Sequence, residues 1–144
     1  MSIWFRTPTL DDLNRKTQDN MCGHLAMEFT EIGPDHLSAR MPVDTRTTQP
    51  AGLLHGGASV ALAETLGSFA AYLCVDSHKK ACVGQEINAN HLRAVRGGWV
   101  IGTARPLHLG KRSQVWDIRI RDEAGALVCV SRLTVAVVER QPRA

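Results

Sequence analysis

Hydrophobic and polar residues alternate with a period of two along much of the chain, which is the pattern of a strand with one buried face. Over residues 25–43 the alternation is interrupted by a Gly33-Pro34-Asp35 turn, and this predicts a β-hairpin. Near the C-terminus, Trp116, Ile118 and Ile120 alternate with charged residues, and the apolar stretch LVCVSRLTVAVV returns after a turn. Two more strands are expected at about 81–94 and 99–106, with a polar loop over 108–113 after them.

Two segments depart from this period and predict helices. Thr9 has the position of an N-cap before a short helix that carries Leu10 and Leu13 toward the body of the protein. Residues 53–75, LLHGGASVALAETLGSFAAYLCV, form a nearly continuous apolar run that predicts a long helix from about Gly56 onward to the end of that run.

The predicted order is a short helix, two strands, a long helix and four strands, in one domain over residues 1–144. The connections between strands are too short for parallel crossovers, so we expect an α+β protein with one helix on an antiparallel sheet. A helix that is apolar on nearly every side needs more cover than one sheet face supplies. We therefore expect a partner subunit to lie against it.

The composition is that of a globular protein, with 44% hydrophobic and 22% charged residues. A formal charge of +3 with no basic run gives no reason to expect a nucleic acid partner. The four cysteines show neither a CxxC pair nor a metal-ligand spacing, which favours reduced thiols in a cytoplasmic protein and no metal site. No secretion signal is visible, and Glu64 inside the long apolar run argues against a membrane span.

Glu64 is the only carboxylate in that run, and on a helix it shares a face with Val60 and Ser68. Burying an ionised carboxylate is costly unless it meets hydrogen-bond donors or faces a cavity. Glu64 could therefore be a structural residue bonded to backbone or to a partner's arginine, or a functional one.

The start of the long helix offers a binding feature. His55-Gly56-Gly57 leaves first-turn N–H groups and the positive end of the helix dipole open to a carbonyl oxygen that gains charge. Gln49 could donate a second hydrogen bond, and His55 could orient a substrate or simply cap the helix. Gly56 and Glu64 are eight residues apart, about 12 Å along the axis, so one small group reaches both only if two copies of the helix cross.

Three separated stretches, QPAGLLHGGASVALAETLGS, INANHLR and PLHLGKRSQVWDI, closely resemble the hotdog-fold acyl-CoA thioesterases that use a helix glutamate. The similarity runs from about Ile3 to Val138. It implies the hotdog fold, a long central helix wrapped by an antiparallel β-sheet, assembled as a dimer or dimer of dimers. It also implies hydrolysis of acyl-CoA thioesters, with aromatic acyl groups of the benzoyl or 1,4-dihydroxy-2-naphthoyl type. Coenzyme A would enter only as part of the substrate, without a further cofactor.

By position, the resemblance makes Glu64 the nucleophile or general base, with Gly56 and Gln49 polarising the thioester carbonyl and His55 and Ser68 placing the thioester and the water. It also implies that coenzyme A crosses a subunit interface, where Arg93, Lys111 and Arg112 would meet phosphates. The full set of implied contacts is Gly84, His91, Leu92, Arg93, Ala94, His108, Leu109, Gly110, Lys111, Arg112 and Ser113.

Several alternatives stay open at this point. The thioester could belong to an aryl carrier protein, as in proofreading thioesterases, or the domain could bind acyl-CoA without hydrolysing it. A hotdog dehydratase fits less well, because it would need a histidine with an acidic partner. The wall of the acyl pocket is expected to include Met21, Phe69, Tyr72 and Leu73.

Overall fold

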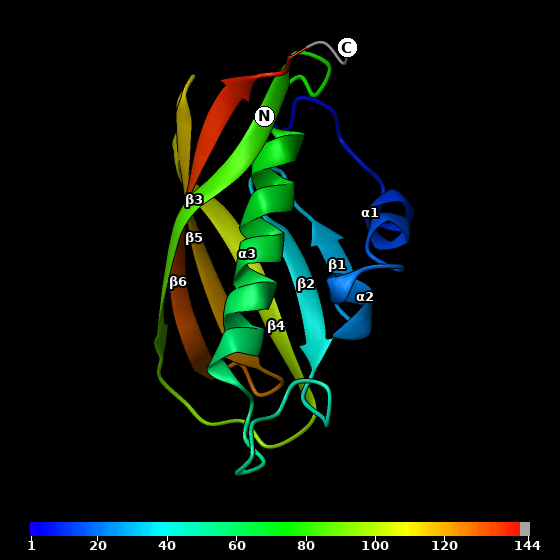
Figure 1. Cartoon of the computed structure of the whole chain (residues 1–144), viewed down its shortest axis with the longest axis vertical. Helices are drawn as coiled ribbons and strands as arrows, with labels where there is room; N and C mark the ends of the chain where they lie inside the picture. The colour runs from blue at the N-terminus through cyan, green and yellow to red at the C-terminus, as the bar shows by residue number, and fades with distance from the viewer. Residues whose placement is uncertain (142–144) are drawn as a thin grey trace.

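The computed structural model describes residues 1–141 as one six-stranded antiparallel sheet with a long helix across it (Figure 1). The strand order is β1-β2-β4-β5-β6-β3, so β1 and β3 are the two edges. The strands are β1 (Glu28–Ile32), β2 (Leu37–Pro42), β3 (Lys80–His91), β4 (Trp99–Leu109), β5 (Ser113–Asp122) and β6 (Leu127–Glu139). The helices are α1 (Leu10–Lys16), α2 (Met21–His24) and α3 (Gly56–Leu73). None of them is long and apolar enough to cross a membrane.

The core lies between α3 and the sheet. Leu62 and Leu66 of α3 are fully buried against inward side chains such as Trp116 and Ile118 of β5. The helix approaches β4 closely, because a Cβ at Gly102 would lie 2.6 Å from Cδ1 of Leu66. This contact holds α3 at a fixed height over the sheet and confirms the predicted arrangement of one helix on an antiparallel sheet.

The other side of α3 is only partly covered by the chain itself. It forms a half-exposed stripe that consists of Val60, Ala61, Glu64, Thr65, Ser68, Phe69 and Tyr72. Beside it, edge strand β3 pairs with β6 on one side only, and Val83 on this strand is 52% exposed. The sequence-based argument that α3 needs further cover therefore applies to a defined surface, made of this stripe and the edge of β3.

Both short helices lie beside β1, across α3 from β3 (Figure 1). The predicted N-cap of α1 is confirmed, since Thr9 accepts a hydrogen bond from the N–H of Asp12 and Leu13 is buried. Asn14 then ties α1 to the free edge of β1, where it donates to the carbonyl of Phe29 and accepts from its N–H.

Four predicted boundaries were wrong. The hairpin begins at Glu28 and not near residue 25, because residues 21–24 form α2, which starts where the side chain of Asn20 accepts the N–H of Cys22. The long helix stops at Leu73, where the N–H groups of the next residues close the last turn. β3 ends at His91 and not at 94, while β4 continues through His108 and Leu109, because a bulge between Pro106 and His108 lets its pairing with β5 resume.

Candidate active site

The start of α3 presents one free donor. His55 caps the helix, with its Nδ1 accepting the N–H of Gly57 at 2.8 Å, while the N–H of Gly56 has no acceptor within residues 1–141. Because Nδ1 is an acceptor in this bond, a neutral His55 carries its proton on Nε2. The capping role considered for His55 is therefore observed, and its outer nitrogen keeps a donor for a further contact.

The loop before α3 positions Gln49 next to this donor. The buried hydroxyl of Thr47 donates to the carbonyl of Pro42 at 2.7 Å, and Gln49 and Leu53 are joined by a backbone hydrogen bond of 2.8 Å. An ion pair between Asp44 and Arg46 closes the turn, and the guanidinium lowers the pKa of Asp44 to about 2. The Oε1 of Gln49 accepts from the backbone of the same turn, which leaves its amide NH₂ without a partner in residues 1–141.

A cavity of about 370 Å³ joins these donors to the end of β3. Its lining residues are Gln49, Leu53, Leu54, Gly56, Ser59, His91, Leu92, Arg93, Ala94 and Val128. The ring of His91 lies close to the start of α3, since a Cβ on Gly56 would be only 2.8 Å from Nε2 of His91. The structure thus brings two groups predicted for the carbonyl, Gln49 and Gly56, together with one of the segments predicted for coenzyme A.

Glu64 lies two turns further along α3, half-buried and with no hydrogen bond or ion pair to any residue in 1–141. Its Oε1 faces the backbone of Gly84 on β3, where a Cβ would be only 2.7 Å away. Gly84 was assigned to coenzyme A by resemblance, but here it lies directly against the carboxylate.

A second cavity of about 330 Å³ opens one turn beyond Glu64 and is lined by Lys16, Ser68, Phe69 and Tyr72. The ammonium group of Lys16 stands 5.5 Å from the centroid of the Tyr72 ring. Two residues predicted for the acyl wall, Phe69 and Tyr72, do line this cavity. The other two do not: Met21 is exposed on α2 and Leu73 is buried elsewhere.

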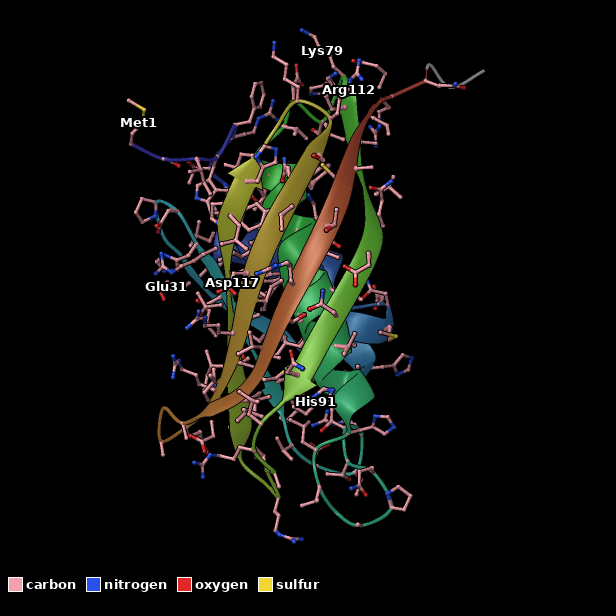
Figure 2. All side chains as sticks on the ribbon, turned by 90° about the vertical axis from the view of Figure 1, so that its left-hand side faces the viewer. Met1, Glu31, Lys79, His91, Arg112 and Asp117 are labelled. Atoms are coloured by element: carbon pink, nitrogen blue, oxygen red, sulfur yellow. The ribbon has the colours of Figure 1, made fainter. Side chains whose placement is uncertain are left out.

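The residues predicted to bind coenzyme A separate into two groups. Figure 2 shows His91 at the lower end of β3 and Arg112 at the opposite end of the sheet. Arg112 accepts a backbone hydrogen bond from Val137, which pairs with Cys82 near the start of β3. Cys82 and His91 are nine strand residues apart, about 30 Å. One chain therefore cannot bring the 91–94 and 108–113 segments to the same small region.

Three of the four cysteines are poor alternatives as nucleophiles. Burial raises the pKa of the Cys74 thiol to about 12 and also raises the pKa of Cys82 and Cys129. Among residues 1–141, no three His, Cys, Asp or Glu side chains gather as a metal site requires. Glu64 is thus the best-placed group for attack on a carbonyl.

Two features of the site escaped the sequence interpretation. Lys16 reaches the Ser68 cavity from a separate helix, and no local pattern connects positions so far apart in the chain. The contact of Gly84 with Glu64 had a weak signal, since a glycine within a strand often marks a close approach of another group. The sequence did not indicate which group that would be.

The fold corresponds to a known class of enzyme. The family model described as "Thioesterase superfamily" matches residues 51–129, more than half of the chain. The chain belongs to this family, and the predicted hotdog fold and thioester hydrolase activity are confirmed.

The individual relatives are similar over nearly the whole chain. The chain is 57% identical to 1,4-dihydroxy-2-naphthoyl-CoA hydrolase of Escherichia coli, covering 94% of this chain and 99% of that protein. It is 54% identical to proofreading thioesterase EntH of Cronobacter turicensis, covering 94% and 98%. The crystal structure of a mutant of thioesterase PA1618 from Pseudomonas aeruginosa matches with a TM-score of 0.95 and 50% identity, covering 96% of this chain and all of that one.

Proposed function

We propose that the protein hydrolyses aromatic acyl-CoA thioesters and that Glu64 performs the attack. The observation that carries this proposal is the half-buried carboxylate of Glu64, which has no partner in residues 1–141 and stands beside an apolar cavity. Glu64 either attacks the thioester carbon or removes a proton from the water that does so, and the coenzyme A thiolate leaves. The N–H of Gly56 and the amide of Gln49 would stabilise the charge that develops on the carbonyl oxygen.

These parts would meet across two chains. Gly56 and Glu64 of one helix are about 12 Å apart along its axis, too far for one carbonyl group. A two-fold axis beside the edge of β3 would place the donor end of one α3 next to Glu64 of the other. The same operation would bring the 108–113 segment of one protomer toward the 91–94 segment of its partner, so that both groups could contact one coenzyme A.

The acyl group is proposed to be aromatic. Phe69 and Tyr72 provide flat apolar walls one to two turns from Glu64, and Ser68 could orient the water or the thioester. A relative at 57% identity is named for 1,4-dihydroxy-2-naphthoyl-CoA, which agrees with such a pocket. The relative named as a proofreading thioesterase supports a second candidate substrate, an aryl group carried on a carrier protein.

We further propose a cytoplasmic homo-oligomer, a dimer or dimer of dimers, that works without a cofactor, nucleic acid or membrane. A thioester is already reactive, so a positioned carboxylate and a donor pair are sufficient to hydrolyse it. The half-exposed stripe of α3 and the edge of β3 offer the surface for the first dimer contact.

The test is replacement of Glu64 by alanine and by glutamine, with thiol release followed on benzoyl-CoA, 1,4-dihydroxy-2-naphthoyl-CoA and an aryl carrier protein thioester. Because each variant removes the base or nucleophile, we expect kcat to fall by about 10²–10⁴-fold while free coenzyme A still binds. Glu123→Gln, which changes an exposed carboxylate in the turn between β5 and β6, is the matched control and should keep normal turnover.

Near-normal turnover by both Glu64 variants would contradict the proposed role. A single turnover in ¹⁸O-water tests for direct attack: this route forms a mixed anhydride, and water that attacks it at the Glu64 carbon leaves the isotope in the carboxylate, whereas a general base puts it only in the released acid. The ratio of kcat/KM between the CoA esters and the carrier thioester identifies the preferred substrate.

A further inference from the structure

We infer that Gly84 is a positioning residue for catalysis, because the missing side chain at this point of β3 determines where the Glu64 carboxylate can stand. This inference rests on the proposed role of Glu64. It also differs from the contact with coenzyme A that the family resemblance implies for Gly84.

The space between the two residues is already closed. A Cβ built on Gly84 would lie 2.7 Å from Oε1 and 3.8 Å from Cδ of Glu64, although ordinary van der Waals contact begins near 3.4 Å. The carboxylate would have to retreat by about 0.7 Å, the difference between 3.4 and 2.7 Å.

The strand is held at this point by the pairing of Gly84 with Val135 of neighbouring strand β6. The same Cβ would be in ordinary contact with fully buried Leu133, at 3.8 Å from its Cδ1. The carboxylate of Glu64, by contrast, is the end of a flexible side chain. An added methyl group would therefore displace the carboxylate and leave the sheet in place, so that the site changes while the fold persists.

An irregularity of β3 sets this contact. Gly84 pairs with Val135 and Glu86 pairs with Thr134, so Gln85 is an extra residue in the ladder. Such a bulge bends and twists the strand locally. This bulge lies immediately next to Gly84, the glycine that faces Glu64 near the middle of α3.

The experiment is Gly84→Ala, measured by kcat, KM, the inhibition constant of free coenzyme A and the melting temperature. A misplacement of a reacting group by close to 1 Å can cost about 10²-fold, so we expect kcat to fall by about 10- to 100-fold. The inhibition constant of coenzyme A should change by less than about twofold. Gly97→Ala is the matched control, because a Cβ at Gly97 meets nothing within 4 Å.

Two double variants show whether the effect passes through Glu64. In a Glu64→Ala background, Gly84→Ala should lower the residual rate no further. Glu64→Asp alone withdraws the carboxylate by about one C–C bond and should itself lower kcat, but adding Gly84→Ala to it should cost little more, because the shorter side chain no longer meets the new methyl group.

The outcomes distinguish this inference from the proposed function. Loss of activity in Glu64→Ala together with normal kcat in Gly84→Ala overturns the positioning role alone. A higher inhibition constant for coenzyme A at unchanged kcat would overturn it in favour of a coenzyme contact. An active Glu64→Ala enzyme would overturn the proposed function itself.

Discussion

At the scale of single residues, the site is built from groups that lack partners in an otherwise satisfied structure. No buried side-chain nitrogen or oxygen in residues 1–141 is without a hydrogen bond. The N–H of Gly56, the amide of Gln49 and the carboxylate of Glu64 are more accessible and remain free. Groups left unpaired at a half-buried surface are available to a substrate without breaking existing bonds.

Substitutions at His55 can distinguish its role as a helix cap from a role in placing the substrate. His55→Ala should lower the free energy of unfolding by about 1 kcal/mol, because the N–H of Gly57 loses its acceptor. Asn is a good N-cap, so His55→Asn should restore stability in urea denaturation, but it should not restore kcat/KM if Nε2–H places the substrate. Full activity of His55→Asn would show that the imidazole is only a cap.

Glu64 could be identified from the sequence because a lone carboxylate in an apolar helix conflicts with its surroundings. The 2.7 Å distance between Oε1 of Glu64 and the Cβ position of Gly84 could not be anticipated. It depends on the bulge in β3, and a bulge is a relation between two strands that local hydrophobic periodicity does not contain.

At the scale of elements, long periodic segments were predictable and short ones were not. The hairpin, α3 and the final strand pair follow hydrophobic patterns of ten or more residues. The four-residue helix α2 depends on one cap at Asn20 and has too few turns to show a period. The end of β4 was mistaken for a loop because His108 and Leu109 are exposed, so their alternation carries no core signal.

The attachment of α1 depends on Asn14, and this can be tested. Asn14→Ala removes both hydrogen bonds to the backbone of Phe29, so we expect a loss of about 1–2 kcal/mol in stability and faster hydrogen exchange at Phe29. Asn14→Asp keeps the acceptor and should show a smaller effect. Because α1 carries Lys16, the KM of aromatic acyl-CoA should also rise. Unchanged exchange at Phe29 in the alanine variant would contradict this role.

At the scale of the whole molecule, the proposed site belongs to no single chain, and mixing two inactive variants tests this. Glu64→Ala chains and Gln49→Ala chains should each be severely impaired alone. After co-refolding in equal amounts, half of the dimers are mixed, and each mixed dimer holds one site with both native residues, so about one quarter of wild-type activity should return. A mixture as inactive as its parents would place both residues in the same chain's site.

The contacts between α3 and β3 have a mechanical consequence. Each element supplies one glycine and one functional side chain. Gly56 of α3 lies against the side chain of His91 on β3, and Gly84 of β3 lies against the side chain of Glu64 on α3. A slip of the helix along the strand would disturb both contacts at the same time, because Gly56 would leave His91 as Glu64 left Gly84. The two halves of the site are therefore held in register by the same packing of α3 on β3. On heating, both contacts should be lost at a single temperature, even while most of the sheet remains folded.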